Sequence, residues 1–230
     1  MVIEGRDLSL IYDMNHDAET YALKEVNITI RAGEFSAIVG PSGSGKSSLL
    51  YLLSGLKKPT TGTIYFDDAD IESFSPFQKD SIRRNQFGFI FQKHLLIDYM
   101  TVLDNILIIP DKNNKVLNDR ALYLLEQLGI KHLSGKKPFQ LSVGQRQRVA
   151  VARALINQPS VVFADEPTAS LDHTNAQEIM SILKNLKKGT SIVVVTHDRS
   201  ILENADKIIE LWDGRIKQSA KAYSLTPLML

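Results

Sequence analysis

The chain has 230 residues, with 27 Lys and Arg against 26 Asp and Glu, a net charge of +1, and no cysteine. Disulfide scaffolds are therefore excluded, and the balanced charge without a Lys/Arg block disfavours nucleic acid as the main partner. The longest apolar runs fall well short of the roughly 20 residues needed to span a bilayer, and the N-terminus lacks the regions of a signal peptide. We expect a soluble chain that contacts a membrane only through another protein.

Short β-rich runs alternate with helical patterns along the chain, which predicts an α/β fold. In chain order the β-rich runs lie at residues 8–13, 26–30, 35–40, 88–92, 160–165, 190–198 and 207–218. The runs VVFAD and IVVVT are apolar throughout, as expected of central parallel strands covered on both faces. The early runs, up to residue 38, are interpreted as antiparallel strands packed beside that sheet. The last run contains Asp213-Gly214, which predicts a hairpin turn.

In the middle of the chain the pattern changes to helices, at residues 119–130 and 144–158. We interpret the segment 93–158 as a helical subdomain inserted between two strands of the core. Residues 1–92 and 159–230 then form the core together with an antiparallel β subdomain. The sequence thus predicts one domain with a core of mainly parallel strands, and it contains no internal repeat or long linker.

The stretch GPSGSGKSS matches the phosphate-binding pattern G-x-x-x-x-G-K-[ST] between a β-run and a helical pattern, the context that the pattern requires. Its glycines let backbone N–H groups surround a phosphate, to which the helix N-terminus adds its positive end. Lys46 is expected to reach the β- and γ-phosphate oxygens, and Ser47 to bind Mg²⁺. The alternative is an ordinary Gly/Ser turn. The predicted nucleotide-binding residues are Gly40, Pro41, Ser42, Gly43, Ser44, Gly45, Lys46, Ser47 and Ser48.

Polar side chains end three of the apolar runs, at the edge of the sheet where ligands of open α/β folds bind. Asp165 and Glu166 follow VVFA, and we predict that Asp165 holds Mg²⁺ and that Glu166 is the base for an attacking water. Gln92 follows GFIF and His197 follows IVVVT. Each of these two, taken singly, is also explained as a hydrogen-bonded residue at the rim of the sheet. Together with the phosphate loop, the pair Asp165 and Glu166 predicts hydrolysis of a nucleoside triphosphate.

A second Gly-rich turn that opens a helix, LSVGQ at residues 141–145, lies well downstream of the first. The order GPSGSGKSS, FIFQ, LSVGQ, VVFADEP, SLD and VTHD resembles the ATP-binding subunit of ABC transporters along nearly the whole chain. The resemblance implies a P-loop ATPase that pairs head to tail with a second copy of itself. Each ATP and its Mg²⁺ would lie between the P-loop of one copy and the LSVGQ turn of the other, so the second turn would serve the partner's nucleotide.

The resemblance also assigns roles by matching position. It implies that Glu166 polarises the attacking water, that His197 contacts the γ-phosphate, and that Gln92 links Mg²⁺ to the helical subdomain. The residues implied to reach across the dimer to the partner's ATP are Ser142, Val143, Gly144, Gln145 and Asp172. An aromatic side chain near the N-terminus should stack on adenine; Tyr12 fits best and Tyr21 is the alternative. An integral membrane permease is the implied partner, which places the chain at the cytoplasmic face of the cell membrane.

The chain departs from the family pattern in two places. Val143 stands where the family usually has glycine; a positive φ there would strain the turn, and we favour the interpretation that the side chain simply points away. The connection after residues 104–110 is short, and it borders the surface that would receive a cytoplasmic helix of the permease. The last residues of the chain give no clear prediction.

The stretch at residues 21–50 is most similar to the bacterial group of lipoprotein-release, macrolide-export, antimicrobial-peptide and cell-division ATPases. Two functions stay open on this basis. One is the energy-coupling ATPase of a transporter, of the export or mechanotransmission type, and the other is a nucleotide switch that signals in cell division without transport. An ATPase head from chromosome maintenance or DNA repair is disfavoured, because the sequence has no heptad run and no cysteine.

Overall fold

The computed structural model describes residues 2–14, 18–108, 114–185, 189–202 and 205–221. The short connection predicted after residues 104–110 lies mostly outside the described residues, as does the C-terminal stretch from residue 222. Within the part of the chain that the structure describes, none of the helices combines the length and the apolar character that crossing a bilayer requires.

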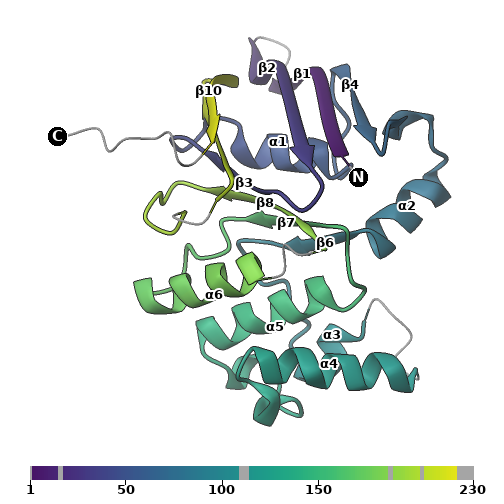
Figure 1. Cartoon of the computed structure of the whole chain (residues 1–230), viewed down its shortest axis with the longest axis vertical. Coiled ribbons are helices and arrows are strands. Elements are labelled where there is room, and N and C mark those ends of the chain that lie inside the picture. Colours follow the sequence, from purple (N-terminus) through teal and green to yellow (C-terminus); the bar gives the residue numbers. More distant parts are fainter. Residues whose placement is uncertain (1, 15–17, 109–113, 186–188, 203–204, 222–230) are drawn as a thin grey trace.

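An antiparallel sheet forms one end of the molecule (Figure 1). Its strand order is β2-β1-β4-β5, and its strands are β1 (Val2–Met14), β2 (Ala18–Arg31), β4 (Thr61–Phe66) and β5 (Ala69–Asp70). Alternating residues such as Ile3, Ile28 and Ile30 are buried on the inner face, because successive side chains in a strand point to opposite faces. The early runs at 8–13 and 26–30 therefore lie in β1 and β2, which pair with each other in an antiparallel register, as predicted.

The core is a six-stranded sheet in the order β10-β9-β3-β8-β7-β6, parallel except for its edge strand β10. The strands are β3 (Phe35–Val39), β6 (Phe87–Ile90), β7 (Val161–Asp165), β8 (Ser191–Thr196), β9 (Lys207–Trp212) and β10 (Arg215–Lys221). β7 and β8 are buried at every residue, which confirms that the continuous apolar runs are central strands. The hairpin between β9 and β10 turns at Asp213-Gly214, as predicted, and both of these residues have positive φ.

The prediction for one strand, β3, is wrong, because the sequence analysis placed it in the antiparallel sheet rather than in the core sheet. Phe35–Val39 was grouped with the antiparallel strands, but β3 lies inside the core sheet, parallel to both β8 and β9. Ser36 interrupts its apolar residues and suggests a strand with one polar face. In the structure Ser36 is fully buried and its hydroxyl bonds to the carboxylate of Glu34, which makes the residue compatible with a central strand.

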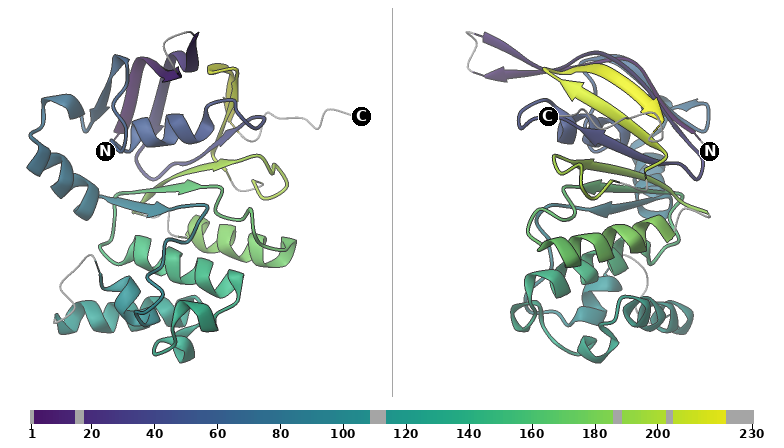
Figure 2. Two further views of the ribbon diagram at one scale, coloured as in Figure 1. Left: turned by 180° about the vertical axis from the view of Figure 1, so that it is seen from behind. Right: turned by 60° about the vertical axis from the view of Figure 1, so that its left-hand side comes forward.

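Helices cover both faces of the core sheet (Figures 1 and 2). α1 (Lys46–Leu53) lies between the two sheets, and α5 (Val143–Leu155) and α6 (His173–Asn185) lie on the opposite face, with α3 (Val102–Ile106) and α4 (Lys115–Gln127) beyond α5. Short 3₁₀ turns occur at η1 (Ile71–Ser73), η2 (Lys131–Leu133) and η3 (Pro138–Gln140). α2 (Pro76–Asn85), α6 and the short α3 are additional to the predicted helices, although α3 lies within the segment predicted as a helical subdomain. α2 does have a sequence signal, because Ser75 and Gln78 form a capping box and Pro76 is its first residue.

Two apolar clusters hold these layers together, one on each face of the core sheet. In β7, Val161 and Phe163 belong to the cluster around α1, whereas Val162 and Ala164 belong to the cluster against α5 and α6. Successive side chains of the strand therefore point alternately into the two clusters. Burial of each Val or Phe stabilises the fold by about 1.5–3 kcal/mol. The result is a rigid sheet whose carboxyl edge carries the polar residues described next.

Candidate nucleotide-binding and hydrolysis site

The phosphate-binding loop runs from the end of β3 to the start of α1 and is enclosed by backbone from two other strands. A Cβ atom on Gly40 would lie 2.1 Å from the carbonyl oxygen of Leu211 in β9. Gly45 has a φ of +98°, and a Cβ there would lie 2.2 Å from the carbonyl oxygen of Ala22 in β2. The loop's first and last glycines are therefore required by close backbone approach within this chain, before any ligand is considered.

The ammonium group of Lys46 lies inside the curl of this loop. Its Nζ donates hydrogen bonds to the carbonyl oxygens of Gly40 and Pro41, both at 2.9 Å, and the residue is only 7% exposed. Ser44 adds a second buried polar group, and its Oγ has no hydrogen-bond partner in the described structure. A buried cation and an unpartnered hydroxyl at the N-terminus of a helix are suited to an anion with several oxygens, such as a polyphosphate.

Asp165 ends β7 directly opposite α1 and is only 5% exposed. Ser47 Oγ donates to its Oδ1 at 2.8 Å and the Tyr51 hydroxyl donates to its Oδ2 at 2.8 Å. Burial, followed by the hydrogen bond to Asp165 and the charge of that carboxylate, raises the pKa of Tyr51 to about 12. The carboxylate is thus held by two hydroxyl donors from one helix. The motif pattern contains Ser47 but gives no reason to expect Tyr51, which the sequence analysis missed.

Glu166 follows Asp165 with a left-handed backbone, at a φ of 47°. Its N–H donates to the carbonyl oxygen of Val195 in β8 at 2.9 Å, which holds this uncommon conformation in place. Both carboxylate oxygens of Glu166 lie 3.0 Å from Nδ1 of His197, the residue that follows β8. The two residues predicted from strand ends therefore form a contacting pair.

Gln92 completes this edge of the sheet. It lies two residues beyond the end of β6 and is exposed. Because β6, β7 and β8 are neighbouring parallel strands, Gln92, Glu166 and His197 all leave the sheet at the same edge. Among the described residues, the side chain of Gln92 has no hydrogen-bond partner.

Of the two candidate aromatic residues, Tyr12 lies against the loop. Its hydroxyl is 3.3 Å from Ser48 Oγ, and Lys57 places its ammonium 3.7 Å from the centroid of the ring. Tyr21 is 44% exposed on β2. The structure therefore brings Tyr12, Ser48 and Lys57 together, and Lys57 is a neighbour that the sequence pattern did not indicate.

The second Gly-rich turn forms the N-terminus of α5. Ser142 is the N-cap: its Oγ accepts from the Gln145 N–H at 3.2 Å, while Gln145 Oε1 accepts from the Ser142 N–H at 2.9 Å. Val143 is the first helical residue and is absent from the residues with positive φ, so the turn is unstrained there. Gly144 differs from Gly40 and Gly45, because a Cβ at this position would meet only ordinary contacts, the nearest at 3.6 Å. Nothing within the chain requires glycine at 144.

A depression of about 510 Å³ lies over this turn. It is lined by Gly129, Ile130, Ser142, Val143, Gly144, Gln145, Arg148, Ser170, Leu171, Asp172 and Asn175. Val143 is among these lining residues, and the direction of its side chain stays a prediction. Asp172 accepts from the N–H and Nδ2 of Asn175, and these bonds lower the pKa of its carboxyl. The P-loop residues, all of which the structure describes, do not line this depression, so the P-loop and the turn at Ser142 lie at separate places on the chain.

A phosphate loop at the edge of a parallel sheet, an adjacent Asp-Glu pair and a second capped glycine turn together define a nucleotide-hydrolysing P-loop protein. Comparison with known proteins specifies the family. The sequence model of the family described as "ABC transporter" matches residues 23–169. The chain belongs to the ABC transporter family, as an ATP-binding subunit that hydrolyses ATP.

Individual relatives agree with this assignment. The chain is 43% identical over 94% of its length to an uncharacterized ABC transporter ATP-binding protein of Methanocaldococcus jannaschii, covering 97% of that protein. It is 41% identical over 90% of its length to the lipoprotein-releasing system ATP-binding protein LolD of Legionella pneumophila, covering 94% of it. It is also 44% identical over 84% of its length to the macrolide export ATP-binding/permease protein MacB of Bartonella henselae, of which it covers 30%.

Solved structures support the same fold. An ATP-binding cassette solved as a dimer in a post-hydrolysis state with ADP and phosphate matches with a TM-score of 0.89 and 38% identity. That match covers 97% of this chain and all of the other chain. A second dimeric structure, described as a bacterial ABC transporter cassette, matches with a TM-score of 0.90 over the same share of both chains. These matches confirm the predicted α/β fold of an ABC ATPase.

Proposed function

We propose that two copies of this chain enclose two ATP molecules, each between the P-loop of one copy and the Ser142–Gln145 turn with Asp172 of the other. The single observation that carries this proposal is that the P-loop and the capped glycine turn lie apart on one chain, so that each would be one half-site of the arrangement. Gly144 strengthens it: its own chain leaves room for a side chain, so a requirement for glycine would come from a ligand or a partner. The dimeric cassettes to which this chain is similar support the same arrangement.

The residues at the carboxyl edge fit Mg²⁺. This cation is usually held by one or two carboxylates together with the phosphate oxygens of a substrate, and Asp165 with the Ser47 hydroxyl supplies such a partial set. In the described ranges, no cluster of three or more His, Asp or Glu side chains could hold a metal ion by itself. Ser47, Asp165 and Gln92 are the proposed ligands or neighbours of the cation, which when bound neutralises charge on the β- and γ-phosphates.

The remaining roles follow from position and contact. Lys46 exchanges its two loop carbonyl partners for the β- and γ-phosphate oxygens, and the backbone N–H groups of the loop surround the phosphates. Glu166 orients and deprotonates the attacking water, with His197 fixing its carboxylate and reaching the γ-phosphate. The half-buried ring of Tyr12, which lies beside Ser48 of the loop, stacks on adenine. Loss of the γ-phosphate would loosen the dimer and release the two copies.

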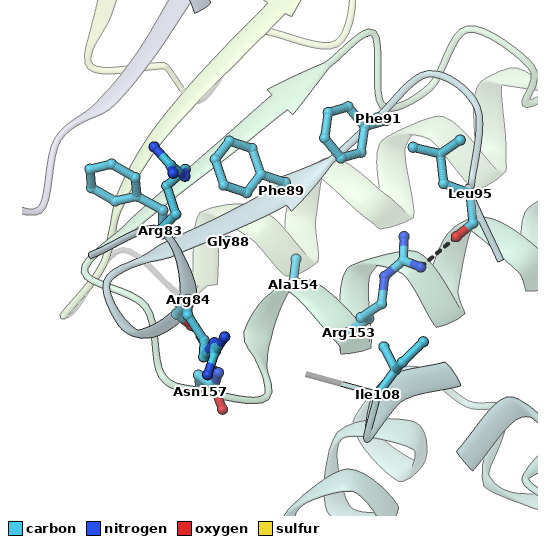
Figure 3. A pocket seen from close by; sticks show the side chains of 11 residues that line it. Arg83, Arg84, Gly88, Phe89, Phe91, Leu95, Ile108, Arg153, Ala154 and Asn157 are labelled. Atoms are coloured by element: carbon cyan, nitrogen blue, oxygen red, sulfur yellow. Dashed lines mark hydrogen bonds between the residues drawn. The ribbon is translucent and has the colours of Figure 1, made fainter. Parts of the chain in front are cut away.

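We further propose that a cytoplasmic segment of a membrane subunit binds the depression shown in Figure 3, which has a volume of about 280 Å³. Phe89, Phe91 and Leu95 give it an apolar wall, and three arginines, Arg83, Arg84 and Arg153, surround it. An apolar helix that carries an acidic residue fits this combination. Arg153 also ties α5 to the segment after Gln92, because it donates to the carbonyl oxygens of His94 and Leu95 at 2.7 and 2.6 Å. Movement of residues 93–158 as one helical subdomain would thereby be passed to the membrane subunit.

The named relatives favour a transporter over the division-type nucleotide switch. LolD is named for a lipoprotein-releasing system, and MacB is named as a macrolide export ATP-binding/permease protein, of which this chain covers 30%. We propose a membrane permease of this exporting or force-transmitting kind as the partner, with the chain attached to it at the cytoplasmic face of the cell membrane.

A mixing experiment tests the composite site. Lys46→Ala disables the P-loop, and Gly144→Asp places a negative charge in the second half-site, where the chain itself has room for the side chain and a helix N-terminus tolerates it. Each variant alone is expected to lose nearly all ATPase activity. In a mixture, mixed dimers contain one intact composite site, so activity should reappear on mixing. A mixture that stays as inactive as its components would contradict a site shared between copies.

A further inference from the structure

Tyr51 has no part in the P-loop pattern, yet it makes one of the two side-chain hydrogen bonds to Asp165. Its hydroxyl donates to Oδ2 at 2.8 Å, while the hydroxyl of Ser47 donates to Oδ1 at the same distance. Ser47 and Tyr51 are four residues apart on α1, so their side chains leave the same face of the helix. The helix that binds phosphate at its first turn thus also holds both oxygens of the metal-site carboxylate.

The fold places the Tyr51 hydroxyl independently of any nucleotide. The ring packs against the apolar cluster between the two sheets, and the Tyr51 carbonyl oxygen accepts from the Lys57 N–H at 3.0 Å and from Ser54 Oγ at 3.2 Å. A tyrosine has only two side-chain torsions, and both are restricted by this packing. The donor to Oδ2 is therefore fixed in place before a ligand arrives.

The two oxygens of Asp165 have different donors, and this difference matters for the binding of a cation. A hydroxyl that donates its proton to Oδ1 keeps its oxygen lone pairs free for a metal, so Ser47 can serve both groups. Oδ2, in contrast, accepts from the hydroxyl of Tyr51, whose ring packs against the apolar cluster. Without that donor the buried carboxylate would have an unpartnered oxygen and a broad choice of side-chain torsion.

We propose that Tyr51 is a positioning residue of the Mg²⁺ site, which holds Oδ2 of Asp165 so that Oδ1 remains turned toward Ser47 and the nucleotide phosphates. This inference rests on the proposed role of Asp165 as a metal ligand. Hydrogen-bond partners of metal ligands typically change metal affinity about 10- to 100-fold when they are removed. Tyr51 should therefore matter for the cation more than for ATP itself.

The test measures metal binding rather than turnover. Mn²⁺ binding in the presence of ATP is followed by electron paramagnetic resonance, in the hydrolysis-blocked Glu166→Gln background, for Tyr51→Phe and two controls. Tyr123→Phe makes the same chemical change at an exposed position on α4, and Asp165→Asn removes the charge of the proposed ligand. Tyr51→Phe is expected to raise the half-saturating Mn²⁺ concentration about tenfold or more, with little change in metal-free ATP affinity. Tyr123→Phe should leave both values unchanged.

The outcomes separate the two levels of the proposal. If Asp165→Asn weakens Mn²⁺ binding but Tyr51→Phe matches Tyr123→Phe, the inference about Tyr51 is wrong and the role of Asp165 stands. If Asp165→Asn also leaves Mn²⁺ binding unchanged, both proposals fail. Thermal unfolding without metal shows whether each variant is folded; a lower melting temperature with an unchanged Mn²⁺ titration would assign Tyr51 a purely structural role. Should Tyr51→Phe not fold, Tyr51→Leu, which is apolar and has no hydrogen-bond donor, is titrated against its Glu166→Gln parent, and an unchanged half-saturating concentration again overturns the inference.

Discussion

Glu166 illustrates how this chain places a reactive side chain at the scale of one residue. It adopts a left-handed φ of 47°, which costs a non-glycine residue on the order of 1–3 kcal/mol and persists only where the surroundings enforce it. Here the enforcement comes from β8, through the hydrogen bond to Val195 and the contact with His197. The strained backbone aims the carboxylate along the edge of the sheet rather than out from the end of β7.

Substitutions at the neighbouring residues Val143 and Gly144 are expected to have different effects on ATPase activity. Val143 already has helical backbone and an exposed fraction of 36%, so Val143→Gly should leave the ATPase rate within about twofold of wild type while lowering the free energy of unfolding by about 0.5–1 kcal/mol. Gly144→Val should abolish most ATPase activity, because it fills space that the proposed partner phosphate needs. Steady-state ATPase assays and urea unfolding of both variants check this pair. A large gain or loss of activity in Val143→Gly would instead make the valine regulatory.

At the scale of elements, the P-loop is a connection clamped between two strands that belong to different sheets. β2 and β9 approach it so closely that Gly45 and Gly40 have no space for a Cβ atom. The turn of the β9–β10 hairpin adds a further clamp, because the Gly214 N–H donates to the carbonyl oxygen of Ser44 at 3.1 Å. The loop is thus preorganised by tertiary structure, and its glycines have a packing role as well as a phosphate-binding role.

This account predicts different costs for two glycines of the same loop. Gly45→Ala should lower the free energy of unfolding by more than about 2 kcal/mol, since a left-handed backbone costs an alanine about 1–2 kcal/mol and the new Cβ would overlap the Ala22 carbonyl. Gly43→Ala has a similar positive φ but nothing within 4 Å of its Cβ, so only the backbone cost of about 1–2 kcal/mol applies. Urea unfolding in the absence of nucleotide measures both. Equal losses would show that β2 does not clamp the loop.

Elements with a strong local signal could be predicted from the sequence, and those defined by packing could not. β7 and β8 are unbroken apolar runs, and the Asp213-Gly214 turn requires two left-handed residues, so their patterns are unambiguous. β3 was misplaced because the buried Ser36 imitates a polar face. The same reasoning explains the site: motif residues such as Lys46 could be named, whereas the contact between Tyr51 and Asp165 depends on how α1 lies across the sheet.

At the scale of the whole molecule, the central claim is that the two half-sites of one chain meet only in a dimer. The P-loop leads into α1 and the second turn opens α5, and the depression over that turn is lined by none of the P-loop residues. ATP would then hold the copies together and hydrolysis would release them, which converts a chemical step into movement of a bound membrane subunit.

The most direct test of this claim is to measure the molecular mass of the Glu166→Gln protein by light scattering after gel filtration. The mass is measured with and without ATP and Mg²⁺. The substitution keeps the shape of the side chain and removes its basicity, so ATP should bind and persist. The account predicts a monomer without nucleotide and a dimer with it, and a Lys46→Ala/Glu166→Gln double variant that stays monomeric in both conditions. A Glu166→Gln protein that retains bound ATP and still elutes as a monomer would contradict the shared site.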